Sequence, residues 1–377
     1  MRLSCLQENL SRGLAVVGRA VATRSPLPIT QNVLIESDQS RLKLAATNTE
    51  IAITTWIGCQ VEEEGSITVP ARLLTELVNS FPAERIDIES SVNPVGLALN
   101  CARSNANVNG IDADEFPPIP TVDEGVAGKI EVAALNEAIS LVAFAAATDD
   151  SRPVLTGIKV EIEGDQFTFA AADGFRLAVY NGKLVEPLAE DVSFIIPARA
   201  LQEISRLIGG QQEPVEFTVT PTKSAALFRF SDTEVVTQLL QGTFPNYSQL
   251  IPDSFDNRAV IKQAEFSRAT KSASIFARDG SGIVRVMVTG SSDETGGKVS
   301  ISSKAEEIGG HEGDVDAQVE GEESKIAFNS RYLSDVLEVI SEEEVALETT
   351  TPSSPGVIRP VGNDNYVHVV MPMFVTW

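Results

Sequence analysis

An internal repeat is the feature of this sequence that most constrains its fold. Three segments resemble one another, and each places an arginine after a strand-like lead-in and before apolar residues at helical spacing. The segments are TVPARLLTELVNSF at 68–81, IIPARALQEISRLI at 195–208 and AFNSRYLSDVLEVI at 327–340. A recurrence of this kind predicts three copies of one domain of about 125 residues.

Two further sets of landmarks keep a similar period. Strand-like segments at 32–37, 157–164 and 283–290 each follow an amphipathic stretch, at 6–21, 132–147 and 263–276, and they align Leu34, Val160 and Val286. Segments rich in proline at 116–120, 244–252 and 369–373 align Pro117, Pro245 and Pro372, and each is expected to follow a strand. The repeat therefore rests on three sets of positions.

The repeat sets the expected domains and the fold class. Polar linkers at 121–128 and 252–258 divide the chain into domains at 1–124, 125–254 and 255–377. Within a copy, helical stretches are separated by runs of candidate strands, such as those at 51–58, 96–104, 167–182 and 215–221. Strands that are grouped apart from the helices predict an α+β fold with antiparallel sheets.

Charge is distributed unevenly along the chain. The 377 residues include 53 acidic and 29 basic side chains, a net charge of −24, which alone argues against a protein held on nucleic acid by phosphate contacts. The six predicted helical stretches nevertheless carry a net charge of +1. The sequence thus predicts nearly neutral helices and acidic sheets and loops, although exposed arginines are also common on helices for reasons of propensity.

Cysteine and histidine usage narrows the chemistry. Cys5, Cys59 and Cys101 form no CxxC pair and lie in apolar or strand-like contexts, which predicts buried free thiols in a reducing cytoplasm. Two histidines, His311 and His368, argue against a histidine metal site or a Ser-His-Asp hydrolase. The sequence holds no apolar run long enough to span a bilayer and no signal-peptide pattern, so we expect no membrane contact.

Eight motifs make the whole chain resemble the bacterial DNA polymerase III beta subunit family, the replicative sliding clamps. They are TRSPLPI at 23–29, TVPAR at 68–72, ADEFPPIP at 113–120, SRPVLTG at 151–157, ADGFRLAV at 172–179, QGTFPNYSQLIP at 241–252, KIAFNSRYLSDVL at 325–337 and YVHVVMPM at 366–373. The resemblance implies three clamp domains per chain and a head-to-tail dimer that closes a six-domain ring. Twelve helices would line its hole, and continuous sheets would form its outside.

The resemblance also implies partners and no catalysis. A clamp encircles double-stranded DNA without reading its sequence, is placed there by an ATP-driven loader, and tethers polymerase and loader subunits through short apolar peptides. It needs no cofactor or metal. Candidate DNA-facing residues are Arg24, Arg72, Arg152, Arg199 and Arg331. Asp149 and Pro153 stand where relatives can carry polar or aromatic DNA contacts, which weakens the expected role of the Arg152 loop.

Two sets of partner-facing positions match the family. The peptide-cleft positions are Leu155, Ala172, Gly174, Phe175, Arg176, Leu177, Pro245, Gln249, Leu250, Val369, Met371, Pro372 and Met373. The dimer-joint positions are Ala106, Val108, Ile275 and Phe276.

Three features at these positions leave alternatives open. Phe175 stands where members of the family often carry a histidine. Ala106 stands where they can carry a large aromatic residue, and the larger Phe276 could offset the lost volume. The final residues, 374–377, extend past the family motif and either fold over the cleft rim or hang free. Without the resemblance, Met-Pro-Met at 371–373 reads equally well as core packing.

Two other classes of protein compete with this interpretation. An enzyme is disfavoured, because TGGKVS at 295–300 is not a phosphate-binding loop and HEGD at 311–314 lacks the second histidine of HExxH. An acidic repeat-domain scaffold without DNA encirclement would share the fold and the cleft. Such a scaffold would remain a monomer and would not associate with closed circular DNA.

Overall fold

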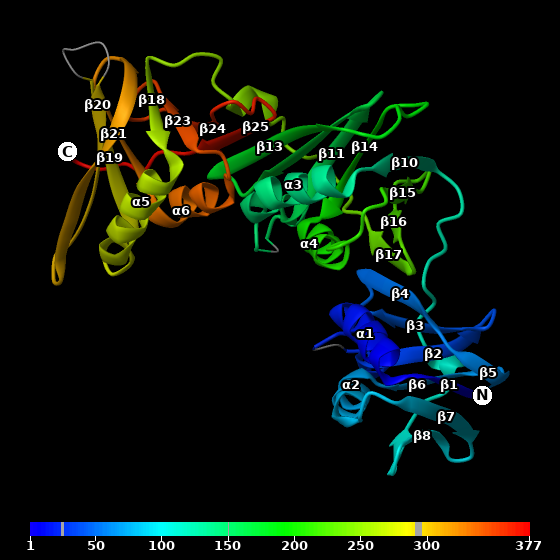
Figure 1. Ribbon diagram of the computed structural model, residues 1–377. Helices are drawn as coiled ribbons and strands as arrows, with labels where there is room; N and C mark the ends of the chain where they lie inside the picture. The colour runs from blue at the N-terminus through cyan, green and yellow to red at the C-terminus, as the bar shows by residue number, and fades with distance from the viewer. Residues whose placement is uncertain (24–25, 150, 291–295) are drawn as a thin grey trace. The chain divides into compact units, whose positions relative to one another are not determined.

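The chain forms two compact units, which are described separately. The computed structural model describes residues 1–23, 26–149, 151–290 and 296–377 (Figure 1). Unit 1 comprises Met1–Val132, Leu184–Glu190 and Ala200–Leu239, and unit 2 comprises Ala133–Lys183, Asp191–Arg199 and Leu240–Trp377. The middle copy of the repeat therefore contributes to both units.

Unit 1 contains two antiparallel sheets and the helices packed on them. The first sheet has the order β5 (Gln60–Glu63), β1 (Arg2–Leu6), β7 (Arg85–Val92), β8 (Val95–Cys101), β9 (Ser104–Asn109). The second has the order β10 (Val126–Ile130), β15 (Val215–Val219), β16 (Ala225–Phe230), β17 (Thr233–Gln238), β4 (Ile51–Gly58), β3 (Arg41–Thr47), β2 (Asn32–Asp38), β6 (Ser66–Pro70). The helices are α1 (Gln7–Val17), α2 (Ala71–Ser80) and α4 (Ala198–Leu207), which enters this unit at Ala200.

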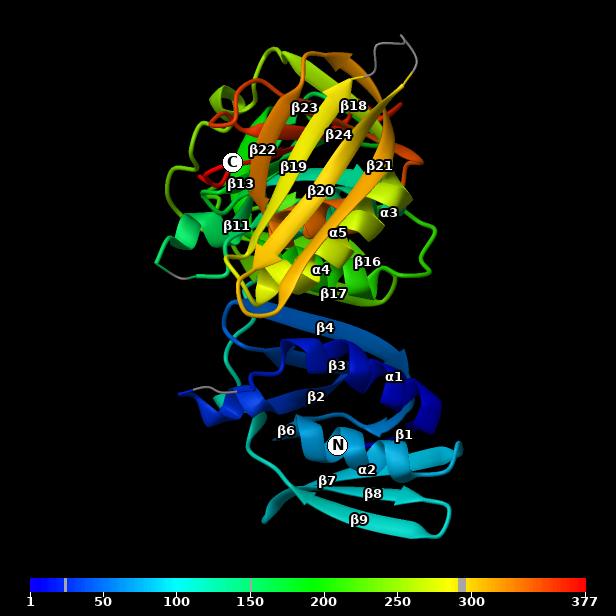
Figure 2. The ribbon, with the colours of Figure 1, turned by 90° about the vertical axis from the view of Figure 1, so that its left-hand side faces the viewer.

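Unit 2 contains one sheet of twelve strands. Its order is β14 (Val192–Pro197), β11 (Gly157–Glu163), β12 (Gln166–Ala172), β13 (Arg176–Lys183), β25 (Tyr366–Val370), β24 (Gly356–Pro360), β23 (Glu344–Thr349), β18 (Asn257–Lys262), β21 (Gly309–Gly321), β20 (Gly297–Ala305), β19 (Ile283–Gly290), β22 (Ser324–Asn329). The helices are α3 (Val132–Val142), α5 (Gln263–Arg278) and α6 (Ser330–Val339). Figure 2 shows α5 behind the face formed by β19, β20 and β21.

Short 3-10 turns complete the described elements. They are η1 (Gly18–Ala20), η2 (Pro28–Gln31), η3 (Ala113–Glu115), η4 (Ala143–Ala145), η5 (Pro153–Thr156) and η6 (Ser248–Leu250).

Alternating burial explains why these segments form half-buried strands and amphipathic helices. In β15 the residues Val215, Phe217 and Val219 are buried while the residues between them are partly exposed, as the period of a strand requires. In α6 the residues Leu333, Val336 and Leu337 are fully buried at helical spacing. Each unit thus places its core between the helices and one face of a sheet.

Strands from different copies pair directly at two places, which we call joints. In the first joint β17 of the middle copy pairs with β4 of the first copy, within unit 1. In the second joint β25 of the third copy pairs with β13 of the middle copy, within unit 2. Both pairings are antiparallel, so each sheet continues from one copy into the next.

The strand register confirms the threefold α+β repeat and corrects two of its landmarks. Asn32 opposes Pro70, Gly157 opposes Pro197 and Ile283 opposes Asn329, so these pairs are equivalent. Counting along the strands makes Leu34 equivalent to Lys159, so its alignment with Val160 was one residue out. Among the proline landmarks, only Pro372 follows a strand closely, because η3 precedes Pro117 and an irregular stretch precedes Pro245.

The segment at 167–182 is a hairpin and not the single strand expected. The backbone turns between β12 and β13, where Gly174 has a φ of +94°, a conformation that favours glycine. The Asp173 carboxylate accepts the backbone N–H groups of Phe175 and Arg176, which closes the turn. The apolar alternation has the same phase before and after Asp173, so the alternation alone did not reveal the turn.

The thiols are free, and two of the three are buried as expected. Cys5 and Cys101 are buried, and desolvation raises the pKa of Cys5 to about 12. Cys59 is only partly buried; it lies between β4 and β5, and its thiol donates to the Ser40 carbonyl at 3.9 Å.

The buried imidazole of His368 lies in the second joint and predicts acid sensitivity. Burial, with a smaller contribution from the Arg176 guanidinium, lowers the pKa of His368 to about 3. The unfolded chain takes up this proton near pH 6.5, so the stability conferred by the neutral ring is complete above pH 6.5 and is lost as the pH falls toward 3. Between pH 7 and pH 5 the free energy of unfolding of the wild type should fall by about 2 kcal/mol more than that of His368→Phe, which keeps the stacking on Phe144. Urea unfolding at the two pH values measures this difference. An equal fall in the free energy of unfolding of both proteins would contradict the lowered pKa of His368.

Candidate functional site

An apolar cluster lies across the second joint, where Leu177 of β13 opposes Val369 of β25. We call it the joint cluster. Its buried members are Leu155, Ala170, Ala172, Leu177, Val179, Ile195, Phe244, Val357, Val367 and Val369, with Ala147, Val154, Leu240, Tyr247 and Ile251 packed against them. It therefore combines the middle copy, the third copy and the segment that links them.

Three exposed apolar side chains stand within two residues of members of this cluster or of residues packed against it, and we call them the rim. The rim residues are Phe175, Leu250 and Met371, which are 57%, 50% and 43% exposed. Two of them are joined through the backbone, since the Met371 N–H donates to the Phe175 carbonyl at 2.8 Å. Large apolar side chains gathered next to a preformed apolar cluster are typical of protein-binding surfaces.

The structure brings most of the expected cleft residues to this place. Leu155, Ala172, Leu177 and Val369 belong to the joint cluster, and Phe175, Leu250 and Met371 form the rim. Gly174 is the turn between the two strands, and Pro245 and Gln249 are exposed residues of the linking segment. The sequence analysis missed Phe244 and Tyr247, which pack in or against the cluster, although both stand in the quoted FPNYSQLIP motif.

Arg176 is an exception among the expected cleft residues. Its side chain is only 8% exposed and forms ion pairs with Asp173 at 3.0 Å and with Asp335 of α6 at 2.6 Å. It also donates to the Phe144 carbonyl at 2.7 Å and stacks on the Tyr332 ring at 4.5 Å. Through these contacts Arg176 connects the middle and third copies.

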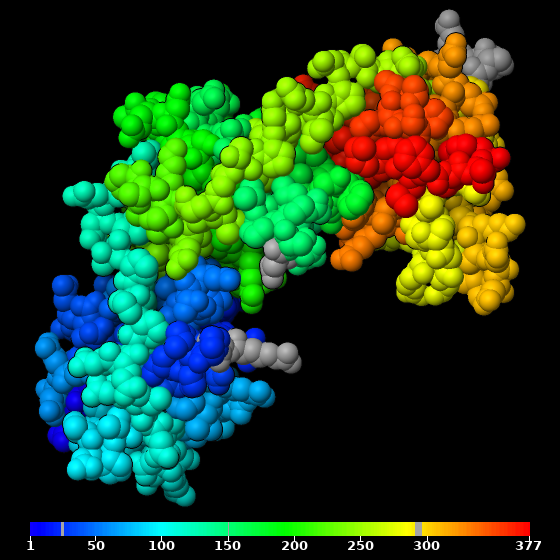
Figure 3. All heavy atoms as spheres, turned by 180° about the vertical axis from the view of Figure 1, so that it is seen from behind, coloured from blue at the N-terminus to red at the C-terminus, as the bar shows by residue number. Residues whose placement is uncertain are grey.

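The chain end after β25 turns away from the rim. Pro372 and Met373 are half-buried, and the Met373 N–H donates to the Ala327 carbonyl of β22 at 2.7 Å. Arg285 of β19 then donates to the Thr376 carbonyl at 3.2 Å. Figure 3 shows these last residues, in red, on the surface of unit 2.

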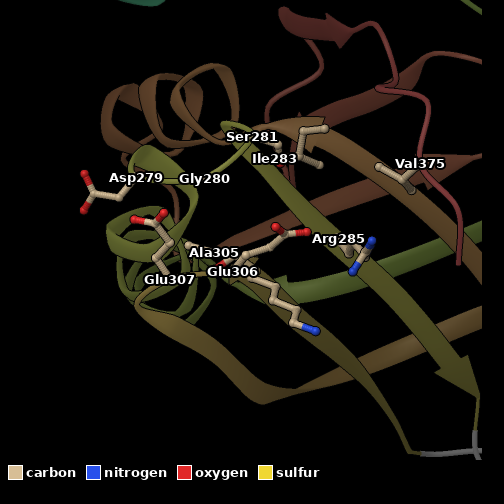
Figure 4. Close-up of a pocket in the computed structure, with 11 residues that line it drawn as sticks. Asp279, Gly280, Ser281, Ile283, Arg285, Ala305, Glu306, Glu307 and Val375 are labelled. Atoms are coloured by element: carbon tan, nitrogen blue, oxygen red, sulfur yellow. The ribbon is translucent and has the colours of Figure 1, made fainter.

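The tail therefore neither folds over the rim nor hangs free. Val375 lines a pocket of about 500 Å³ with Ile283, Arg285 and the turn that follows α5 (Figure 4). Phe374 remains 86% exposed and Trp377 53% exposed. Residues 374–377 thus lie along the third copy.

Three of the five candidate DNA-facing arginines occupy the same position in three helices. Arg72, Arg199 and Arg331 are the second residues of α2, α4 and α6, and all three are exposed. Arg72 pairs with Glu76 at 2.9 Å and is 92% exposed, while Arg331 lies 3.9 Å from Asp335 and is 82% exposed. Exposed pairs of this kind contribute little to stability, so these guanidinium groups can reach a polyanion.

The other two candidates differ from this group. Arg24 lies outside the described residues. Arg152 donates to the Asp173 carbonyl at 2.8 Å and lies over Gly174, so its guanidinium sits on the β12–β13 turn. Beside it, hydrogen bonds from Ser151 hold the pKa of Asp149 below its usual range, and Pro153 begins η5.

The expected dimer residues lie on one sheet edge and one helix. Ala106 and Val108 are in β9, where Ala106 is half-buried and Val108 is buried. Ile275 of α5 is 58% exposed, and the neighbouring Phe276 stacks on His311 of β21 with ring centroids 6.4 Å apart. The sequence analysis considered His311 only in arguing against a metal site, since nothing in the sequence placed it beside Phe276.

Among the described residues, no three or more His, Cys, Asp or Glu side chains are grouped in a way that could hold a metal ion. No helix in the described part of the chain is long and apolar enough to cross a membrane.

Comparisons with known proteins identify the fold as that of a DNA polymerase sliding clamp. A crystal structure of the sliding clamp from Bacillus subtilis matches with a TM-score of 0.94 and 28% identity, over 100% of both chains. The beta subunit from Pseudomonas aeruginosa matches with a TM-score of 0.91 and 26% identity, over 99% of this chain and 100% of the other. The beta sliding clamp of Synechocystis sp. is 30% identical over 393 aligned positions, which cover 99% of each chain.

Family models agree with these similarities in each third of the chain. The N-terminal, central and C-terminal domains of the DNA polymerase III beta subunit match residues 1–120, 129–246 and 248–374. The chain belongs to the DNA polymerase III beta subunit family.

Asp335 tests the structural role assigned to Arg176. Asp335→Ala would leave a buried guanidinium without one of its carboxylates, and we expect it to lower the free energy of unfolding by about 1–3 kcal/mol. Glu338→Ala on the same helix removes an exposed ion pair with Lys271 and should cost less than about 0.5 kcal/mol. Equal losses in denaturant unfolding would refute the role of Arg176.

Proposed function

We propose that this chain is a DNA sliding clamp, a non-enzymatic processivity subunit that encircles duplex DNA and tethers a replicative polymerase. The observation that carries the proposal is edge-to-edge strand pairing between copies at two joints. Among the strands with a partner on one side only are β9 and the first part of β21, which hold the same places in the strand order of their copies as the strands of the joints. Two chains placed head to tail would join these edges twice. The result is a closed ring of six domains in which each subunit contributes three.

Retention on DNA would be topological in this proposal. A closed ring does not need the many phosphate contacts that hold ordinary DNA-binding proteins, so a net charge of −24 is compatible with the function. Charges more than about 10 Å away are largely screened at 0.1 M salt, so a few cations near the duplex outweigh distant acidic groups. Arg72, Arg199 and Arg331 are the candidates for this role, and Arg24 and Arg152 are retained as proposed positions of weaker support.

The rim and the joint cluster are proposed to bind partner peptides. Methionine and leucine side chains adapt to differently shaped apolar partners, which suits a surface shared by polymerase and loader subunits. Phe175 would contribute apolar area that does not titrate, unlike a histidine. Pro245, Gln249, Leu250, Pro372 and Met373 would border the bound segment.

Two substitutions in the rim test the peptide site. We expect Leu250→Ala combined with Met371→Ala to weaken binding of a short apolar peptide from the cognate polymerase at least about tenfold, because two partly exposed side chains lose the area they would bury. Fluorescence anisotropy with a labelled peptide measures this change.

Leu73→Ala is the matched control, since Leu73 is 51% exposed on α2 and lies outside the rim. Unchanged affinity in the rim variant, or an equal loss in the control, would exclude the rim as the peptide site.

Linearisation of a loaded plasmid tests encirclement. We expect the chain, placed on nicked circular DNA by its loader with ATP, to co-elute with the circle in gel filtration and to be released when a restriction enzyme cuts it. Retention on the circle should change little between 50 and 200 mM salt, because counterion release does not govern a topological link. Retention after cutting, or release by salt alone, would favour the scaffold alternative.

A further inference from the structure

Two of the three cysteines lie close together in the first sheet. Cys5 is in β1, and Cys59 is the single residue between the end of β4 and the start of β5 (Figure 1). β1 and β5 are antiparallel, with Ser4 opposite Gln60. One further step along both segments in the same register places Cys5 opposite Cys59. Directly opposed Cα atoms of an antiparallel pair are about 4.5–5.5 Å apart, which is within the range of a disulfide.

The two thiols also lie on the same side of the sheet. Opposed residues of an antiparallel pair point to one side. Cys59 continues the alternation of Ile57, which lies against Gly13 of α1, and α1 begins two residues after Cys5. After burial, the next largest cause that raises the pKa of Cys5 is the charge of the Cys59 thiolate. The two sulfurs therefore lie within electrostatic reach of each other.

Cys101 is too distant to compete for either thiol of this pair. It lies in the same row of the sheet, because Cys5 opposes Ile86 of β7 and Ile86 opposes Cys101 of β8. Two strand spacings of about 4.8 Å each separate it from Cys5, and Cα atoms more than about 7 Å apart cannot be bridged. The Cys101 thiol instead donates to the Pro82 carbonyl at 3.7 Å.

We propose that Cys5 and Cys59 form a site of reversible oxidation, at which a low-mass disulfide converts the two thiols into a cross-link that fastens β5 to β1. The inference is independent of DNA encirclement and of peptide binding, since both cysteines lie outside the joint cluster, the rim and the helix arginines.

The chemistry consists of two thiol–disulfide exchanges. The Cys59 thiolate, which is the less buried of the two, gives up its contact with the Ser40 carbonyl and attacks one sulfur of the reagent. The S–S bond of the reagent breaks, one thiolate leaves, and a mixed disulfide remains on Cys59. The Cys5 thiolate then attacks the Sγ of Cys59 and releases the second thiolate. Two electrons and two protons pass from the protein to the reagent, which leaves as two thiols.

Burial makes the reduced pair slow to react. Desolvation raises the pKa of Cys59, and it raises that of Cys5 to about 12, so little thiolate is present near neutral pH. The second exchange takes place within the chain, so the reagent never has to enter the buried position of Cys5. The cross-link therefore requires prolonged exposure to the oxidant, and the thiols are otherwise free.

The cross-link would fasten a weakly held strand. β5 has four residues and ends its sheet, and the register of its pairing with β1 shifts between Arg2 and Leu3. It also follows directly on β4, the strand that forms the first joint with β17. Segments with few buried contacts open at a lower free energy than the core of a domain. A bond between β1 and residue 59 would hold β5 in the sheet.

Counting thiols tests the site. We expect long incubation of the full chain with oxidised glutathione, followed by thiol titration in denaturant, to lower the number of free thiols from three to one. Trypsin should then release residues 3–12 and 44–72 as one cross-linked species, which a reducing agent separates. Three remaining thiols, or a glutathione adduct on Cys59 that does not proceed to the cross-link, would overturn the proposal.

Two variants serve as matched controls. Cys101→Ser should form the cross-link in unchanged yield, because Cys101 is out of reach of Cys5. Cys59→Ser/Gln60→Cys moves the second thiol by one residue to the opposite side of the strand, and this variant should accumulate the glutathione adduct instead. An equal yield of cross-link through residue 60 would overturn the register that places Cys5 opposite Cys59.

Limited proteolysis tests the fastening of β5. A glutamate-specific protease can cut after the exposed Glu62, Glu63 and Glu64 when β5 opens. We expect the cross-link to slow this cut at least about fivefold, and reduction to restore the rate, because a cross-linked strand opens less often. Cutting after the exposed Glu124, which precedes β10, is the internal control and should not change. Equal rates at 62–64 in the reduced and cross-linked chains would overturn the fastening of β5.

Discussion

Antiparallel pairing between strands of different copies is the contact on which the rest of this structure depends. β17 on β4 and β25 on β13 continue each sheet from one copy to the next, so the backbone ladder itself connects the domains. Because a ladder fixes both register and direction, the helices of neighbouring copies acquire fixed positions relative to the joint. The joint cluster and the Arg176 contacts exist only because β13 and β25 are adjacent, and neither could form within an isolated copy.

The sequence predicts the repeat well because each copy carries the same local patterns of residues. The helix starts at Arg72, Arg199 and Arg331 combine a turn residue with helical spacing of apolar residues, and each appears where expected. The register between strands is less visible. The residue equivalent to Leu34 is Lys159 and not its neighbour Val160, and only the pairing register of the strands reveals this difference. The β12–β13 turn was missed because the alternation of apolar residues keeps the same phase on both sides of Asp173, although the Asp-Gly pair is itself a turn signal.

The candidate site was predictable where it consists of side chains from a recognisable motif. Leu177, Val369 and Met371 all gather at the second joint as the family resemblance implied. Arg176 belongs to the same motif, but its side chain points to Asp173 and Asp335, since an arginine in a buried position requires carboxylates nearby. The residues that a strand side chain contacts depend on the neighbouring strand, and that strand is distant in sequence, so the sequence pattern alone does not predict these contacts.

The composition of the free β9 edge has a further consequence for the isolated subunit. An unpaired strand that displays apolar side chains is prone to indiscriminate association and amyloid-like growth. β9 reads SNANVN, and its only large apolar residue, Val108, already faces the core. Its asparagines therefore make this strand a poor template for indiscriminate association while it has a partner on one side only.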